Sequence, residues 1–448
     1  MPHSKSRSLL LTGSLLLMGL VACSLTGTLQ ATAADPTLAA TATPVEQHLS
    51  YPIVDTGQTQ CYDDQDRITC PQNGQAFFGQ DAQVVGNQPA YQDNGDGTIT
   101  DLVTGLMWQK TPGEQQTWAE ALAGAESFYL AGYDDWRLPT IQELYSLMDF
   151  SGVDPSGWND TDPSQLVPFI DTDYFDFEYG DEVAGERLID AQYWSSTVYA
   201  ATTMNGAVTA FGVNFADGRI KGYPSAAIGP PGDTFTMTAF VRYVRGNPEY
   251  GQSELVNNDD GTIRDLATGL TWVQADSGVG MDWKSALGYC QDLELAGVSD
   301  WRLPNAKELH SLVDYTRAPD TTASAAIDPV FQVSVVTDEG GESDYPFYWT
   351  STTHANWSKA EGAWGAYLAF GEALGWMETP GGSRELMDVH GAGAQRSDPK
   401  SGDPAAWPVG NGPQGDVVRI YNYVRCVSDT QSSSPPPLYS VQLPTIFQ

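Results

Sequence analysis

The chain has 448 residues, and its 57 Asp and Glu against 21 Lys and Arg give a formal net charge of -36 at pH 7. So negative a protein repels polyanions, which makes nucleic acid and anionic lipid poor partners and leaves neutral glycans, cations and basic proteins open. Only 17% of the residues are charged, while Gly, Pro, Trp and Tyr are abundant, a balance typical of an extracellular protein rich in β-structure.

The N-terminus predicts export. Two basic residues precede an apolar run over residues 9–22, which is short for a membrane span and suits a secretory signal. The run ends at Cys23 in a sequence similar to the bacterial lipoprotein processing box, where this cysteine becomes the lipidated first residue. Cleavage after Ala33 is the alternative. We therefore predict a signal peptide over residues 1–23 and a lipid-anchored protein of the cell envelope or cell surface, or otherwise a secreted one.

The segments that flank the central part of the chain have distinct compositions. Residues 24–50, rich in Ala and Thr, predict a flexible spacer. Residues 51–79 predict a lead-in closed by a disulfide between Cys61 and Cys70, because an exported chain meets an oxidising compartment. Residues 430–448 predict a Ser/Pro linker and a short apolar tail. We expect contact with the membrane only through the N-terminal lipid.

The central part presents one order of motifs twice, over residues 80–247 and again over 248–429. The motifs of the first and second copies begin at Asp93 and Asn258 (a turn rich in Asp and Gly), Thr104 and Thr268 (TGLxW), Asp135 and Asp300 (DWRLP), Tyr193 and Tyr348 (YWSST or YWTST), and Tyr243 and Tyr423 (YVR). A period of roughly 165 residues is the length of a whole domain, so the pattern predicts a tandem duplication of one globular module.

The second copy gives the expected elements of one module in chain order. Asp-Asp-Gly at 259–261 predicts a hairpin turn. Apolar spacing predicts a helix over 282–293, and Asn305 is a suitable N-cap for a second helix over 306–313. Strands are expected over residues 348–352, 365–370 and 417–425. Two helices, antiparallel strands and long loops predict an α+β domain.

The remaining cysteines predict a second disulfide. Cys290 follows the first helix of the second copy, and Cys426 follows its closing motif. Alignment of the copies puts Ala125 and Gly246 at the equivalent positions of the first copy. Because both cysteines are replaced together, we expect them to pair with each other across one module.

The ordered motifs resemble the family named for the C-terminal domain of the Legionella collagen-like protein, over both copies. The Arg-Leu-Pro helix start is also similar, at the level of fold, to the formylglycine-generating-enzyme branch of C-type-lectin-like domains. The resemblance implies two tandem C-type-lectin-like modules and a secreted or surface binding protein. It also implies adhesion to glycans, notably sulfated glycosaminoglycans in the named member, although the acidic charge of this chain suits that ligand poorly.

The repeated Trp-Arg and Tyr-Trp motifs begin secondary-structure elements, which favours packing in the core over a sugar platform. The residues concerned are Trp136, Arg137, Trp194, Trp301, Arg302 and Trp349. Each arginine is expected to hold backbone carbonyls or a buried carboxylate. The candidate carboxylates are Asp135, Glu143, Asp300 and Glu308.

Ligand binding is expected in loops that differ between the copies. The second copy carries a long Gly- and Pro-rich insertion over 371–415, and its candidate ligand-binding residues are Trp376, His390 and Trp407, since exposed aromatic rings can stack on sugars. The alternative is an ordered loop whose tryptophans pack on the domain. An acidic, aromatic stretch in the first copy is either a solvated loop or a lip that binds a cation or partner, with candidates Asp173, Asp176 and Glu178.

No cofactor or metal is predicted. The weak calcium candidates are Asp93, Asp96, Asp259 and Asp260. If the glycine of each turn is the sixth position of a calcium loop, the twelfth position falls on Val103 or Ala267, where a bidentate Glu is required. We therefore expect hairpin turns at these sites.

No catalytic residues are predicted, because the five histidines show no metal-ligand spacing and the chain has no nucleophile elbow and no phosphate-binding loop. We expect a cell-surface binding or adhesion protein, not an enzyme, that recognises an extracellular ligand, most directly a glycan, through loops of two modules. The first alternative is a structural envelope protein that binds other protein subunits. The second is a secreted enzyme that acts on glycans or a relative of formylglycine-type oxidases.

Overall fold

The computed structural model describes residues 49–158, 163–183, 185–229, 234–379 and 381–429. The predicted signal peptide, the lipid site at Cys23, almost all of the spacer and the C-terminal tail lie outside these ranges. No helix within them is long and apolar enough to cross a membrane.

Five short α-helices lie among the described residues: α1 (Trp118–Ala125), α2 (Ile141–Tyr145), α3 (Trp283–Gln291), α4 (Ala306–His310) and α5 (Pro319–Thr322). The equivalent helices α2 and α4 begin with the same capping box, in which Thr140 or Asn305 and a glutamate three residues later satisfy each other's backbone N–H groups. The predicted helix 306–313 ends earlier, at His310. Single 3-10 turns are η1 (Asp81–Gln83), η2 (Pro163–Gln165) and η3 (Pro404–Ala406).

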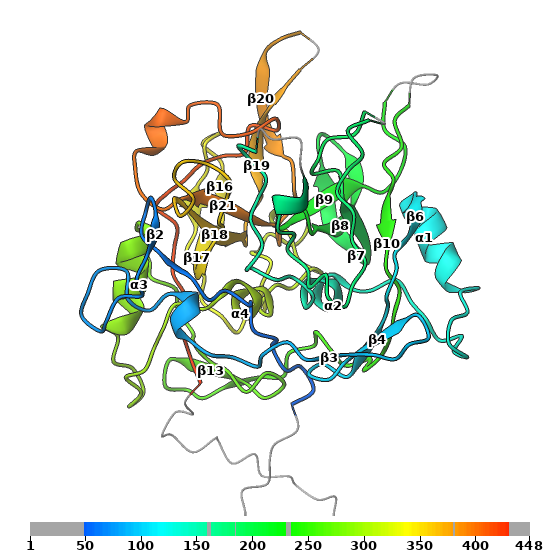
Figure 1. Ribbon diagram of the computed structural model, residues 1–448. Helices are drawn as coiled ribbons and strands as arrows, with labels where there is room; N and C mark the ends of the chain where they lie inside the picture. The colour runs from blue at the N-terminus through cyan, green and yellow to red at the C-terminus, as the bar shows by residue number, and fades with distance from the viewer. Residues whose placement is uncertain (1–48, 159–162, 184, 230–233, 380, 430–448) are drawn as a thin grey trace, which may run out of the picture. The chain divides into compact units, whose positions relative to one another are not determined.

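One eight-stranded sheet contains strands of both copies. Its order is β17 (Phe347–Thr353), β18 (Trp364–Ala369), β21 (Gln395–Pro399), β9 (Arg219–Pro224), β8 (Ala207–Asn214), β7 (Gln192–Thr203), β10 (Ala239–Val241) and β6 (Gly113–Gln116). The strands β17, β18 and β21 of the second copy correspond in order to β7, β8 and β9 of the first. The two sets are joined edge to edge by the antiparallel pair β21–β9, in which Gln395 lies opposite Ile220 (Figure 1). The copies are thus related by an approximate two-fold axis at this seam.

Each copy also has a small antiparallel sheet that joins its opening hairpin to its closing strand. The first has the order β11 (Val244–Gly246), β5 (Leu106–Gln109), β4 (Thr98–Asp101), β3 (Tyr91–Asp93), and the second β12 (Leu255–Asn257), β13 (Thr262–Asp265), β14 (Thr271–Val273), β22 (Val427–Ser428). The hairpin turns depend on positive φ angles, 59° at Asp259 and 88° at Gly261.

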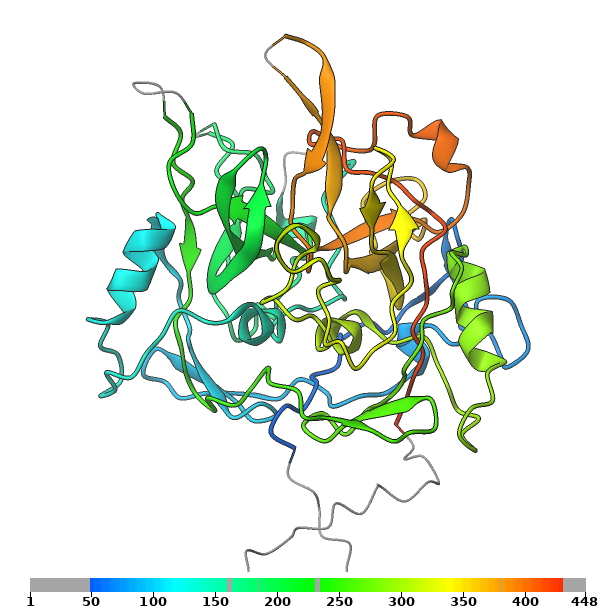
Figure 2. The same cartoon turned by 180° about the vertical axis from the view of Figure 1, so that it is seen from behind.

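Three two-stranded ribbons complete the described strands: β1 (Cys61–Tyr62) with β2 (Arg67–Ile68), β15 (Val336–Thr337) with β16 (Ser343–Asp344), and β19 (Leu374–Glu378) with β20 (Arg384–Asp388). The β19–β20 hairpin extends away from the large sheet, while α1 and α3 lie on opposite flanks with α2 and α4 side by side between them (Figure 2). The content is mostly β with few helices, and it is compatible with the predicted α+β class.

The hydrophobic core is shared by the two copies. The Phe211 ring of the first copy packs edge-on against Tyr315 of the second with 4.7 Å between ring centroids, and both side chains are buried. A second cluster in the second copy surrounds the Cys290–Cys426 disulfide. Both predicted disulfides are present, the other being Cys61–Cys70.

The strand predicted over 417–425 is wrong. No strand forms over these residues. The strand β22 begins only at Val427, and Asn422 and Tyr423 make isolated bridges instead. The cause is a contact with a distant part of the chain, since the buried Asp398 carboxylate accepts hydrogen bonds from the backbone N–H groups of Arg419 and Ile420, and Ile420 has a φ of 62°. Alternating apolar residues do not form a strand where a side chain takes the backbone donors.

Candidate functional site

The repeated Trp-Arg and Tyr-Trp motifs lie in the core. All four of their tryptophans are buried, from Trp136 at 4% exposure to Trp194 and Trp349 at 0%. Arg302 binds Glu308 through two contacts of 2.6 and 2.7 Å, and Arg137 pairs with Glu143 through one guanidinium nitrogen in the first copy.

The other candidate carboxylates of these motifs have different partners. Asp135 pairs with Arg245, and Asp300 accepts a hydrogen bond from Ser428. The Trp-Arg motifs therefore secure the start of α2 and α4, and their tryptophans offer no exposed ring to a ligand.

The weak calcium candidates are built into their turns. Asp96 and Asp260 each accept hydrogen bonds from the hydroxyl and the backbone N–H of the threonine two residues later. Asp93 forms an ion pair with Lys110 at 2.6 Å, and the backbone N–H of Asp259 donates to Asn257. Within the described ranges no three His, Cys, Asp or Glu side chains come together as a metal site.

The acidic, aromatic stretch of the first copy is divided between core and solvent. Phe175 is buried, whereas Asp173, Asp176 and Glu178 are exposed. Asp176 accepts a hydrogen bond of 2.5 Å from the Thr111 hydroxyl. This arrangement matches a solvated loop whose aromatic rings pack inward.

His390 does not lie on an exposed loop surface. It is 1% exposed, and its Nε2 lies 2.9 Å from Asp416 Oδ1. Burial lowers the pKa of His390 to about 4, so the ring is neutral at pH 7. The prediction that His390 contacts ligand directly is therefore wrong. The residue lies between β20 and β21, and its backbone carbonyl accepts a hydrogen bond from Gly222 on β9 of the first copy.

Trp376 and Trp407 converge on one cavity of about 410 Å³, which we call the aromatic pocket. Trp376 is on β19, and Trp407 follows η3. Phe347 and the half-exposed Tyr421 also contribute to the wall. Both tryptophans are partly exposed, and neither indole N–H donates to any described residue.

Polar side chains border the aromatic pocket. Arg419 forms two hydrogen bonds of 3.1 Å to the Glu339 carboxylate, and its guanidinium lies 3.9 Å from the centroid of the Phe347 ring. Asn422 also lies in the wall. The pocket therefore combines aromatic faces with an oriented ion pair, the combination found in many small-molecule sites.

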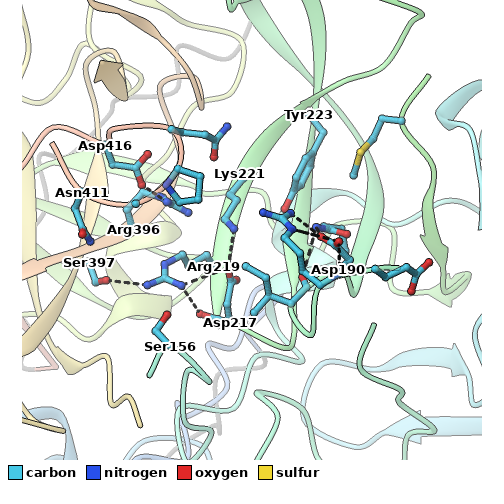
Figure 3. Close-up of a pocket in the computed structure, with 18 of the residues that line it drawn as sticks. Ser156, Asp190, Asp217, Arg219, Lys221, Tyr223, Arg396, Ser397, Asn411 and Asp416 are labelled. Carbon is cyan, nitrogen blue, oxygen red and sulfur yellow. Dashed lines mark hydrogen bonds and ion pairs between the residues drawn. The ribbon is translucent and has the colours of Figure 1, made fainter. Parts of the chain in front are cut away.

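A second cavity, of about 570 Å³, lies where β9 meets β21, and we call it the junction cleft. Figure 3 shows Asp217, Arg219, Lys221 and Tyr223 of the first copy facing Arg396, Ser397, Asn411 and Asp416 of the second. Arg396, Ser397 and Asn411 belong to the 371–415 insertion, and Asp416 directly follows it.

Ion pairs line the floor of the junction cleft. Lys221 Nζ lies 2.6 Å from Asp217, and Arg219 lies 3.3 Å from Asp217 and 2.7 Å from Asp154. Arg396 pairs with Asp416. Burial lowers the pKa of Lys221 to about 8, whereas Lys221 and Arg219 overcome the effect of burial on Asp217 and hold its pKa below the usual range.

A family model, the Lcl C-terminal domain, matches residues 97–245 and 261–383, which together are more than half of the chain. The chain belongs to the Lcl C-terminal domain family. The two matched segments confirm the predicted tandem repeat of this domain. Comparison with curated proteins and with solved structures found no match.

Family membership and the two disulfides are compatible with an exported, surface-associated protein. The second Lcl C-terminal domain match stops at residue 383. Trp407, Arg396 and Asn411 lie beyond it, so part of the aromatic pocket and the second-copy wall of the junction cleft are formed by sequence outside the matched segments.

Proposed function

We propose that this protein is a surface-associated binding protein that holds an extracellular glycan in the aromatic pocket. The observation that carries the proposal is the convergence of Trp376 and Trp407 on one cavity. Aromatic faces stack on the apolar faces of sugar rings, and a free indole N–H can donate to a sugar hydroxyl. The volume of about 410 Å³ falls in the range of small-ligand sites.

The polar border of the pocket supports binding and does not support catalysis. Glu339 is the single carboxylate among the described residues that line the cavity, and Arg419 already engages it. Glycoside hydrolysis ordinarily requires two carboxyl groups on opposite sides of the bond. We therefore propose no catalytic residue, and no metal or cofactor, for this site.

The proposed location follows from the N-terminal sequence, with export and lipid attachment at Cys23. The C-type-lectin-like assignment of each module is likewise part of this proposal. Because the domain is duplicated, each protein molecule would carry two modules on one lipid anchor.

The test is a glycan-array screen of the purified mature protein at physiological salt, with calcium and again with chelator. We expect selective binding that Trp376→Ala or Trp407→Ala abolishes and that chelator leaves unchanged. Trp357→Ala is the matched control, because Trp357 is a 36% exposed tryptophan that lines neither cavity. Silence across neutral and acidic glycans would reject glycan binding and favour a structural protein that binds other envelope subunits.

A further inference from the structure

The junction cleft exists only because the two copies pack together. The first copy forms one wall, from β9 and residues 186–192 and 235–238, and the second copy forms the other, from β21 and residues 411–418. Neither copy alone contains both walls. A site here would therefore give the duplication a function that one module could not have.

We propose that the junction cleft is a second binding subsite, which takes a neutral, polyhydroxylated group such as an uncharged sugar unit of the same glycan. The inference rests on the proposed glycan-binding function, but it concerns a different cavity and a different set of residues.

The charges of the cleft favour a neutral ligand. Its three most enclosed cations are Arg219, Lys221 and Arg396, whose side chains are 16%, 11% and 11% exposed, and the carboxylates they bind are Asp154, Asp217 and Asp416. These ion pairs are balanced in charge. Asp398, a further buried carboxylate of the lining, is held by hydrogen bonds from Asn422 and from two backbone N–H groups. An ionic ligand group would bring an extra, uncompensated charge to this network, and burial of such a charge is costly.

The cleft also offers both donors and acceptors to a ligand. The side chains of Asn411 and Gln414 are partly exposed and bind no described side chain or backbone group. Behind this exposed surface, buried polar atoms of three lining residues lack a partner within the described part of the chain, namely Arg396 Nε, Asp217 Oδ1 and the Tyr223 hydroxyl. A sugar hydroxyl donates and accepts, so one ligand class can use this mixed surface, which a purely anionic group could not.

The two cavities adjoin. Val417 and Val418 line both the junction cleft and the aromatic pocket. In the proposed complex, an oligosaccharide with one unit on Trp376 and Trp407 passes over these two valines to place a further unit in the cleft. The arrangement predicts that longer neutral oligosaccharides bind more tightly than short ones.

The experiment is titration calorimetry of the mature protein with neutral gluco-, manno- and galacto-oligosaccharides of one to six units, and with sulfated counterparts. We expect Asn411→Ala or Gln414→Ala to weaken the longer neutral ligands about five- to tenfold, the loss of one hydrogen bond, and to leave the shortest unchanged. Trp376→Ala should weaken all lengths. Gln88→Ala, an exposed amide outside both cavities, is the control.

Each other outcome overturns a defined part of the proposal. Equal binding of the longer ligands by the wild type and both amide variants would overturn the second subsite and leave the aromatic pocket in place. Tighter binding of a sulfated ligand than of its neutral counterpart would overturn the preference for neutral groups. Failure of every neutral oligosaccharide to bind would overturn this inference together with the proposed function.

Discussion

The loop length of the Cys290–Cys426 disulfide predicts how much unfolding free energy the protein loses when this bond is reduced. Its cysteines are separated by 136 residues, whereas those of Cys61–Cys70 are separated by 9. In the chain-entropy model, closing the long loop contributes about 5 kcal/mol to the free energy of unfolding and closing the short one about 2.7 kcal/mol. Both sulfurs of the long bridge are also buried in an apolar cluster.

The assay is equilibrium unfolding in urea, with and without reductant, on two double variants. In the Cys61→Ala/Cys70→Ala protein, reduction opens Cys290–Cys426 and leaves its sulfur atoms in the core, so the change reports the cross-link itself. The Cys290→Ala/Cys426→Ala protein reports the short bridge in the same way. We expect the larger loss of stability for the long bridge. An equal or smaller loss would refute the loop-length argument.

Three further predictions concern buried charge and ligand binding. Arg302→Ala leaves the buried Glu308 unpaired and should cost about 3–5 kcal/mol of unfolding free energy. Arg245→Ala should cost only about 0–1 kcal/mol, because its partner Asp135 is 58% exposed. Similar urea midpoints for the two variants would contradict this prediction. Burial raises the pKa of Asp81 to about 7, so its contribution to stability is present below the unfolded-state pKa and is lost as pH rises toward 7. Asp81→Asn should therefore flatten the fall in unfolding free energy between pH 4.5 and 7.5, and an unchanged slope would count against it. The affinity for neutral glycan should be nearly independent of salt between about 50 and 500 mM, a range over which the Debye length falls from about 14 to about 4 Å. The affinity for an ionic ligand would fall steeply over the same range.

Much of the local structure could be predicted from the sequence. The hairpin at Asp259, the N-cap at Asn305 and the α3 helix depend on residues a few positions apart, and such short-range interactions leave a readable pattern. The second disulfide could be predicted because the two copies act as a comparison, with Ala125 and Gly246 replacing both cysteines. Trp376 and Trp407 could be chosen as candidates by their type and their place in an insertion, and their contact with a ligand stays a prediction.

Other features left no such pattern. Nothing near His390 in the sequence signals that its side chain is buried where the second copy meets β9 of the first. The 417–425 segment alternates like a strand, yet Asp398, about twenty positions away, takes its N–H groups. The residues of the junction cleft, among them Arg219 and Lys221, carry no motif. The nearest signal was the presence of basic residues on strands of an acidic chain.

The sequence by itself determined the duplicated module, its capped helices and turns, and both disulfide pairings, because each depends on neighbouring residues or on comparison of the two copies. The tertiary structure alone decided that β21 pairs with β9, that the two copies share one core, and that the 416–418 segment lies between two cavities. Strand pairing between residues about 175 positions apart is selected by the total packing of both modules, and no local pattern encodes it.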